Sequence, residues 1–439
     1  MSKYGIMTIA PEQTEKSDPP KRTLYSITQQ VFNLDWFFLN IIMQPYFKFA
    51  KSIMHIKSVS FQIIVTLYFA VFWLFVGCKE PFMPELEFKE TNFLVVEGYI
   101  NIGTDAVTEI RLSRTVPVEE TQTEPLRENN AVIVIEDDLE NIYTLTELSN
   151  GIYISDTLSL PFERSYRIRI STSDQVEYTS DFSTPIQTPA IDSVSWVRVT
   201  DGLEVHVATH DPLGSTFYYQ WDYEEVWELR SPYFSFYSYA NGQFFPREES
   251  EIQAMRKCWR TATPPNLIVR STGTFVSDAI SLTLFNIPAF NERLGENYSV
   301  LIRQHALSME AFNYLQVMIK NTNQLGTFFD PQPSQLTGNI TVKGSDKAVI
   351  GFIEAYTTSE ERIYIKKVDV PWWNFNFPCT TIEFSVDPET IEANFGQALY
   401  IPVTFNDVQT KMSGASPTCA DCRRRGGNNN KPSFWDDVF

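Results

Sequence analysis

The sequence predicts a mostly β protein built from two consecutive β-rich domains. Aromatic residues make up 14% of the chain, with 33 Phe and 20 Tyr, and flat rings pack well on the pleated faces of strands. Short apolar or alternating segments recur through most of the chain at a spacing of roughly ten residues, with turn residues between them. We therefore expect an N-terminal immunoglobulin- or transthyretin-like β-sandwich, followed by a larger β-sandwich-like domain that carries one packed helix.

A hydrophobic segment lies at 61–76, and its sixteen residues carry no charge. A lysine precedes it and Gly77-Cys78 follow it, so 54–77 has the basic start, the apolar core and the small residue before the cleavage point that define a signal peptide. The tetrad that ends at Cys78 resembles the lipoprotein cleavage motif, with Phe75 in the place of the usual leucine. The resemblance implies that the thiol of Cys78 carries a lipid. A transmembrane helix, which needs about 20 apolar residues, is the alternative.

Residues 1–53 do not fit this leader, because a signal peptide begins close to the N-terminus. Met54 opens the sequence MHIKSVSF, which has the composition of such a beginning. We therefore expect translation to start at Met54 and residues 1–53 to be an upstream extension; a disordered cytoplasmic tail is the alternative. Residues 78–92 would then tether the folded part to the lipid.

The first β-rich domain is expected over 93–188. Asn150-Gly151 marks a tight hairpin, because both residues tolerate a positive φ. A proline-containing stretch at 184–189 separates this domain from the next. The predicted strands are 93–100, 107–115, 131–137, 142–148, 151–156, 165–172 and 176–182.

The second, larger domain is expected over 190–437. Its helix is predicted at 308–323, where Phe312, Leu315 and Ile319 form one apolar stripe at helical spacing. The predicted strands are 193–199, 203–209, 217–225, 266–272, 281–287, 298–306, 339–342, 348–356 and 362–368.

Four cysteines remain after the leader, an even set that is compatible with two disulfides in any of three pairings. They are Cys258, Cys379, Cys419 and Cys422. The last two form a C-x-x-C motif, for which a redox-active pair and half of a zinc site are the alternatives. The motif lies in a loop-like sequence without a second C-x-x-C. His206 and His210 are four residues apart on a predicted strand, which places them about 13 Å apart, too far for one metal. We therefore favour structural disulfides and expect no metal or other cofactor.

Two aromatic stretches are candidates for a binding surface. The first consists of Tyr233, Phe234, Phe236, Tyr237, Tyr239, Phe244 and Phe245, and the second of Trp372 and Trp373 with Phe375 and Phe377. Each could pack in the interior or between domains, or it could present rings to a sugar or a protein. The sequence leaves both alternatives open.

The net charge of −19 excludes a nucleic-acid partner, because phosphates need a basic surface. The basic run Arg423–Arg425 is interpreted as a solvated tail that pairs with local carboxylates; contact with an acidic partner or a lipid headgroup is the alternative. No catalytic motif of the nucleophile-elbow, metalloprotease or phosphate-loop type is present. We therefore expect no enzymatic activity, although a hydrolase whose two carboxylates meet only in the fold is a further hypothesis.

Several stretches together resemble one known family. They include LVVEGYI, EIRLSRT and NGIY in the first half, and YSVLIRQHALSMEAFNYLQ, GTFFDPQPSQLTGNI and CADCRRRGGNNNKPSFW in the second. From 78 to 435 the chain is similar to the Bacteroidota lipoproteins that share domain of unknown function 4249. The resemblance implies a lipid-anchored accessory protein of the outer membrane, next to a TonB-dependent transporter and without known enzyme activity.

Lys79 and Glu80, directly after the lipid-bearing cysteine, resemble the surface-export signals of such lipoproteins. The chain is therefore expected at the outer membrane. It could be on either face of that membrane, one of which is the cell surface. The leading interpretation is a non-catalytic accessory subunit of a TonB-dependent uptake system. The alternative is a lipoprotein that captures glycan or peptide on its aromatic surface without a fixed partner.

Overall fold

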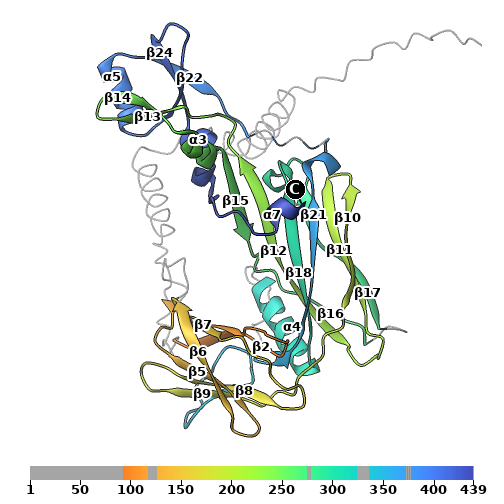
Figure 1. Cartoon of the computed structure of the whole chain (residues 1–439). Coiled ribbons are helices and arrows are strands. Elements are labelled where there is room, and N and C mark those ends of the chain that lie inside the picture. Colours follow the sequence, from red (N-terminus) through yellow and green to blue (C-terminus); the bar gives the residue numbers. More distant parts are fainter. Residues whose placement is uncertain are drawn as a thin grey trace, which may run out of the picture. The chain divides into compact units, whose positions relative to one another are not determined.

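The computed structural model describes residues 92–116, 126–273, 278–323, 336–371, 373, 375 and 377–438. The predicted leader, the predicted lipidation site Cys78, the predicted tether at 78–92 except its last residue, and Trp372 lie outside the described residues. The predicted mostly-β class is confirmed, since strands far outnumber helices in the described part of the chain (Figure 1). None of the described helices is long and apolar enough to cross a membrane.

The first sheet contains nine strands and curls around its own apolar core. The hairpin at Asn150-Gly151 is confirmed, because it joins two paired strands and Gly151 has a φ of 72°. The strands in chain order are β1 (Leu94–Gly98), β3 (Glu109–Arg114), β4 (Leu126–Arg127), β5 (Val132–Asp137), β6 (Ile142–Ser149), β7 (Ile152–Ser155), β8 (Tyr166–Ser171), β9 (Glu177–Ser180) and β19 (Ile340–Val342).

A segment from far along the chain covers both edges of this sheet. At one edge β19 pairs with β9. At the other edge Ile350 pairs with Val95, and β20 (Ala355–Tyr356) pairs with β2 (Ile100–Asn101) in parallel. The prediction that this segment belongs to the second domain, with one strand over 348–356, is therefore wrong. Exposed strand edges need partners, but local periodicity does not say which edge a segment will cover.

The second sandwich packs two sheets on one shared core. That core contains Leu203 and Ile287 from one sheet, and Trp221 and Val300 from the other. The first sheet has the order β10 (Ile191–Val199), β11 (Gly202–His210), β17 (Ala279–Pro288). The second has the order β15 (Lys257–Ala262), β12 (Tyr218–Arg230), β18 (Tyr298–Ala306), β21 (Thr358–Ile365), with β16 (Ile268–Ser271) also paired to β12.

The predicted helix is confirmed as α4 (Met309–Asn323). The hydroxyl of Ser308 accepts a hydrogen bond from the backbone N–H of Ala311 at 3.0 Å, which caps the helix N-terminus. Phe312, Leu315 and Ile319 all pack into one apolar cluster, as their spacing predicts. The cluster also contains residues of the first sandwich, so α4 lies against both sandwiches.

A third, small assembly of strands and helices was not predicted. Its core contains Ile391, Phe395 and Met412. The elements are the hairpin β13 (Tyr237–Ala240) and β14 (Gln243–Pro246), the three-stranded sheet β22 (Thr381–Ser385), β24 (Lys411–Ala415) and β23 (Ile401–Phe405), the helix α5 (Pro388–Ile391) and the π-helix η3 (Glu392–Gly396).

Short helices complete the second half of the chain. They are α3 (Glu249–Arg256), η1 (Glu292–Leu294), η2 (Lys367–Asp369), α6 (Pro417–Ala420), η4 (Cys422–Arg425) and α7 (Trp435–Val438). Four of them, α3, η1, η2 and η4, contribute residues to the cavity described next.

Candidate functional site

The first aromatic stretch divides into partly buried and exposed rings. Tyr237, Tyr239 and Phe244 are partly buried against the core of the small assembly, and Tyr233 is partly buried beside the Cys379–Cys419 bridge. By contrast, the exposed set has accessible fractions of 38% for Phe234, 45% for Phe236 and 44% for Phe245. The sequence left open whether these rings pack inside the protein or lie at its surface. Some rings of the stretch do the first and others the second.

Two of the exposed rings lie together. The rings of Phe234 and Phe236 are stacked, with their centroids 5.9 Å apart. The guanidinium of Arg256, the last residue of α3, lies 4.3 Å from the centroid of Phe234. A cation over an aromatic face is attracted by the ring quadrupole. The stretch thus presents rings and a positive charge side by side.

The second aromatic stretch contributes to the same region. Phe377 lies under the guanidinium of Arg425, at 4.8 Å from its ring centroid. Phe375 and Phe377 both line the cavity described below. Trp373 instead belongs to the core of the second sandwich, and Trp372 lies outside the described residues.

A cavity of about 240 Å³ lies where these segments meet. It combines seven charged side chains with two aromatic rings. A second hollow of about 530 Å³ shares Glu292 and Phe375 with it. The cavity is lined by Glu228, Leu229, Arg230, Ser231, Pro232, Arg256, Glu292, Gly295, Glu296, Lys367, Phe375, Phe377 and Arg425.

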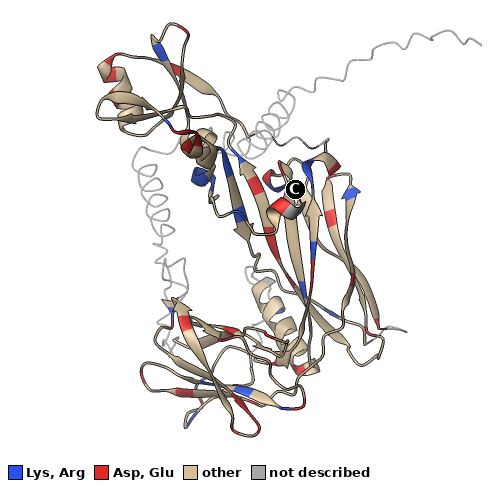
Figure 2. Cartoon of the chain, viewed as in Figure 1, with Lys and Arg blue, Asp and Glu red and all other residues tan. Residues whose placement is uncertain are grey.

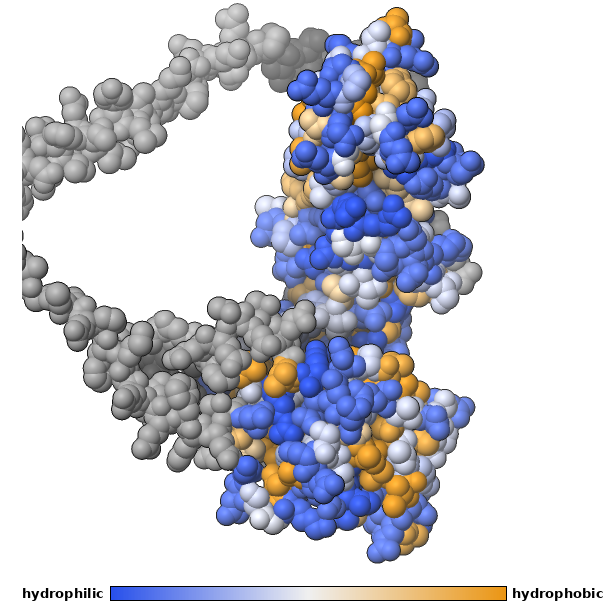
Figure 3. Space-filling view, turned by 90° about the vertical axis from the view of Figure 1, so that its left-hand side faces the viewer, coloured by the Kyte–Doolittle hydropathy of each residue, from blue (hydrophilic) through white to orange (hydrophobic). Residues whose placement is uncertain are grey.

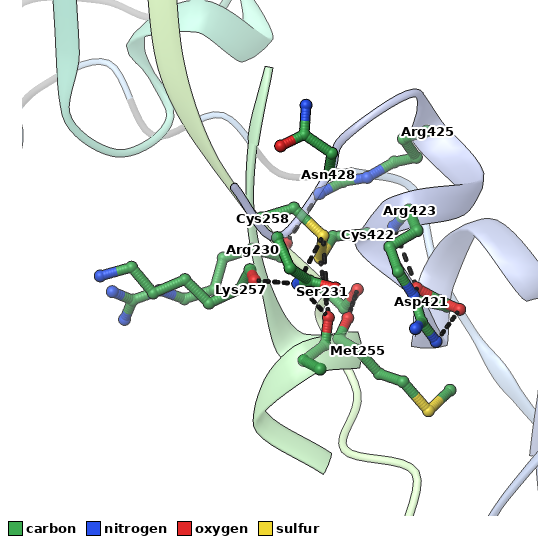
Figure 4. Close-up of a disulfide and its surroundings, with 12 residues drawn as sticks. Arg230, Ser231, Met255, Lys257, Cys258, Asp421, Cys422, Arg423, Arg425 and Asn428 are labelled. Carbon is green, nitrogen blue, oxygen red and sulfur yellow. Dashed lines mark hydrogen bonds and ion pairs between the residues drawn. A yellow bond between two sulfur atoms is a disulfide. The ribbon is translucent and has the colours of Figure 1, made fainter. Parts of the chain in front are cut away.

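A disulfide between Cys258 and Cys422 holds the wall of this cavity (Figure 4). It joins the start of β15 to η4 across 164 residues. Beside the bridge, the hydroxyl of Ser231 donates a hydrogen bond to the carbonyl of Met255 at 3.0 Å. On the other side, the guanidinium of Arg425 donates to the carbonyl of Arg230 at 2.9 Å. The C-terminal tail is thereby fixed against β12 and α3.

The prediction of two disulfides is confirmed, and the structure supplies their pairing. The second bridge joins Cys379 to Cys419, so it ties the tail to the loop that carries Phe377. The two cysteines of the C-x-x-C motif therefore bond to different partners rather than to each other or to zinc. No group of potential metal ligands occurs within the part of the chain that the structure describes.

Positions of Lys and Arg on β15 lie beside positions of Asp and Glu on β12, the strand with which it pairs (Figure 2). Glu228, with 1% of its side chain exposed, forms ion pairs with Arg230 at 2.7 Å and with Lys257 at 3.2 Å. Arg230 also approaches Glu296 at 3.8 Å. Burial opposes the charge of Arg230, but the hydrogen bond to Glu228 and these nearby carboxylates raise its pKa. This part of the wall is electrostatically compensated.

Two other cations of the lining are less well compensated. Arg425 pairs with Glu292 at 3.0 Å, yet burial lowers the pKa of Arg425 against the attraction of that carboxylate. For Arg256, burial and then the neighbouring charge of Arg230 lower the pKa. The cavity therefore holds positive charge that the protein itself does not fully neutralise.

The basic run Arg423–Arg425 has a mixed outcome. Arg423 pairs with Asp421 at 2.8 Å, and Arg424 is exposed, as expected for a solvated tail. Arg425 differs, because only 6% of its side chain is exposed and it forms part of the cavity wall. Nothing in the spacing of the three arginines distinguishes Arg425 from its neighbours.

The cavity also brings carboxylates together, which the hydrolase hypothesis requires. Glu228, Glu292 and Glu296 all line it. Each lies within ion-pair distance of a lysine or arginine. Carboxylates held in this way accept hydrogen bonds from cations, and the arrangement is better suited to shaping a binding site than to donating a proton.

The hydropathy of the surface supports a local site rather than a broad one. On the face shown in Figure 3, hydrophobic residues form small separate groups within a mainly hydrophilic surface. Large apolar interfaces need a continuous patch of several hundred Å². The charged cavity and the exposed rings beside it are therefore the best-defined candidate site.

Fold and site together define a disulfide-bonded, mostly-β protein with an arginine-rich, aromatic cavity. The chain belongs to the family described as domain of unknown function (DUF4249), whose model matches residues 79–362. The match covers both sandwiches as far as β21 and ends before Lys367, Phe377 and Arg425. Comparison with curated proteins finds no match.

Similar solved structures are distant. A DUF4785 family protein from Legionella pneumophila has 12% sequence identity and a TM-score of 0.19, and the comparison covers 48% of this chain and 52% of that protein. The chain thus spans about half the length of this structure. A two-domain fibronectin type III segment of chicken tenascin also has 12% identity, with a TM-score of 0.15, 62% of this chain covered and 97% of the segment.

Proposed function

We propose that this chain is a lipoprotein anchored to the outer membrane through Cys78, where it serves as a non-catalytic binding subunit of a TonB-dependent uptake system. The leader sequence supports the anchor, because its apolar core ends at Gly77-Cys78. The two disulfides support export, because such bridges form and persist in oxidising compartments.

The observation that carries the binding role is the convergence of both aromatic stretches on one charged cavity. Phe234 and Phe377 come from segments far apart in the sequence, and each has an arginine over its ring. Arg256 and Arg425 both line the cavity. Stability alone does not require a solvent-accessible cavity with this composition, whereas recognition of a ligand or a partner does.

The test is co-purification of the tagged chain from native membranes in a mild detergent. We expect a TonB-dependent transporter to be recovered with the wild-type chain and to be lost with Cys78→Ser, which cannot be lipidated. Leu213→Ala, at an 87% exposed position away from the cavity, is the matched control and should behave as wild type. Repeated recovery of the chain alone would contradict the accessory role.

The exposed pair Phe234 and Phe236 favours a second candidate, capture of glycan or peptide without a fixed partner. Sugars and peptides both stack on exposed aromatic faces. Calorimetric titration with glycan and peptide pools distinguishes this role. The stand-alone role would be favoured by two results together. The double variant Phe234→Ala, Phe236→Ala would abolish the binding, and the wild-type chain would never co-purify with a transporter.

A further inference from the structure

The charges around the cavity do not balance. Its three carboxylates all lie within ion-pair distance of a lysine or arginine, and Arg230, Lys367 and Arg425 are among those partners. Arg256 is the fourth cation of the lining. Among the residues that the structure describes, no carboxylate lies within ion-pair distance of it. One guanidinium in excess therefore lines a cavity in a protein whose net charge is −19.

The contact that Arg256 does make leaves its hydrogen-bond donors available. The central carbon of the guanidinium lies over the ring of Phe234, 4.3 Å from its centroid. A phenyl ring has no oxygen or nitrogen acceptor, so this contact uses none of the five N–H donors of the arginine in a conventional hydrogen bond. Within the described part of the chain, the structure shows no hydrogen bond from these donors.

A half-buried charge without a counter-ion is unfavourable, because its lost hydration is not replaced. The pKa of Arg256 is lowered first by burial and then by the repulsion of Arg230, and the more distant attraction of Glu296 does not outweigh them. The attraction of an anionic ligand would offset both effects. The planar fork of an arginine matches a carboxylate, which can accept two parallel N–H bonds from it.

We propose that the cavity binds the carboxylate of a small organic ligand through Arg256, with the rings of Phe375 and Phe377 beside the rest of the ligand. This inference rests on the proposed binding role of the cavity, but not on the lipid anchor or the transporter. A volume of about 240 Å³ lies below the usual range for drug-sized ligands. It therefore suits one acidic sugar unit or one amino-acid residue.

The test is calorimetric titration of the detergent-solubilised full chain with two matched probe pairs, glucuronate against glucose and N-acetylphenylalanine against its amide. We expect at least one carboxylate to bind and its neutral counterpart not to bind. Binding of glucuronate would identify an acidic sugar as the source of the carboxylate, and binding of N-acetylphenylalanine a peptide C-terminus. Arg256→Gln should weaken the binding by at least about 10-fold, because it removes a charge-assisted hydrogen-bonded pair.

Two further variants separate the role of Arg256 from general charge effects. Arg424→Gln removes an equal charge from an exposed position of η4 that does not line the cavity and should leave the affinity within about 2-fold of wild type. Arg256→Lys keeps the charge but loses the planar fork, so its affinity should lie between those of wild type and Arg256→Gln. Thermal unfolding of each variant verifies that it is folded.

Three results would overturn the inference. They are equal binding of a carboxylate and its neutral counterpart, unchanged binding in the folded Arg256→Gln variant, and no binding of either carboxylate. Recovery of a transporter with the same preparation would show that the proposed function survives such a result. If no transporter co-purified but the carboxylate probe still bound, the accessory role would be contradicted and the proposed carboxylate site would be supported.

Discussion

The first sandwich and the cavity region use charged residues in opposite ways. In the first sandwich, charges lie on half-exposed faces and pair across strands, as Glu136 of β5 does with Arg167 of β8 at 2.9 Å. The interior is apolar, with Ile135 and Ile168 fully buried. Around the cavity, charges line a partly open hollow, and Arg256 has no carboxylate within ion-pair distance among the described residues. The first region is thus arranged for stability, and the second is the region to which we assign the proposed binding role.

The two regions are also assembled differently. Most pairings of the first sheet join strands that are close in the sequence, such as β6 with β7 and β8 with β9. The cavity instead brings together five separate segments, and the Cys258–Cys422 bridge closes a connection of 164 residues between two of them. The cavity region should therefore depend on its bridge more strongly than the first sandwich depends on any one strand contact.

The largest effect is expected from removing that bridge. In the chain-entropy model, Cys258→Ser with Cys422→Ser lowers the free energy of unfolding by about 5 kcal/mol, because the unfolded chain gains the freedom of a long loop. Loss of the bridge also releases Arg425 from the cavity wall. Urea unfolding followed by tryptophan fluorescence measures the loss, and titration with the carboxylate probe measures the effect on the cavity.

The matched control is the double serine variant of Cys379 and Cys419. That bridge closes only 40 residues, so the same model gives a loss smaller by about 1 kcal/mol. An equal or larger loss at the shorter loop would mean that native packing, rather than loop closure, decides the stabilisation.

After the two bridges, the next largest effect is expected in the core of the first sandwich. Ile168→Ala removes a side chain of 0% exposure and should cost about 3 kcal/mol, through lost burial and a residual cavity. Urea unfolding measures the cost. Probe affinity under native conditions should stay at the wild-type value, since the cavity shares no residue with this core. A weakened affinity in the folded variant would show that the two regions are coupled.

The sequence predicted the regular parts of the molecule well, for a physical reason. Strands and the helix α4 have periods that are visible locally, and Phe312, Leu315 and Ile319 pack on one face as their spacing requires. Closure of the first sheet by Ile340–Val342 and Ala355–Tyr356 was missed. A strand edge accepts any suitable segment, and the pattern of a segment does not encode which edge it meets.

The candidate site was predicted only in part. Cysteine number implied two bridges but not their pairing, because pairing depends on which segments become neighbours in space. The aromatic stretches were identified by composition, yet their division into buried and exposed rings was not. Arg256 and Arg425 carried no signal of their own, because the local sequence does not reveal which arginine will line a cavity or lack a carboxylate partner after folding.

A third, smaller effect should depend on pH. Asp211, in the turn after β11, accepts hydrogen bonds from the backbone N–H groups of Leu213 at 2.9 Å, and of Ser215 and Thr216 at 2.8 Å. Burial opposes the charged form, but these bonds outweigh it and lower the pKa of Asp211 to about 2. Because the folded pKa lies below the unfolded value of about 3.9, the stabilisation is present above pH 4 and is lost as the pH falls through 2.

Asp211→Ala should therefore cost about 2 kcal/mol at pH 7, the magnitude that such a shift implies. The difference in urea midpoint between wild type and variant should shrink between pH 4 and pH 2. A constant difference over that interval would show that the turn is stabilised by shape rather than by the carboxylate charge. The pH dependence matters for the comparison with the cavity, because the charge of Asp211 is fully compensated by hydrogen bonds whereas that of Arg256 is not.

The smallest effect on stability is expected at Arg256, although its effect on binding is large. Arg256→Gln loses a ring contact that contributes about 0.5–1 kcal/mol but also removes an uncompensated, half-buried charge. The two changes nearly offset, so the free energy of unfolding should shift by less than about 0.5 kcal/mol. Arg425→Gln should cost more, because it breaks the pair with Glu292 and leaves the carbonyl of Arg230 without its donor. If Arg256→Gln destabilised the protein as much as Arg425→Gln, Arg256 would contribute to stability in the same way as Arg425. The proposed difference between the first sandwich and the cavity region would then be contradicted at Arg256.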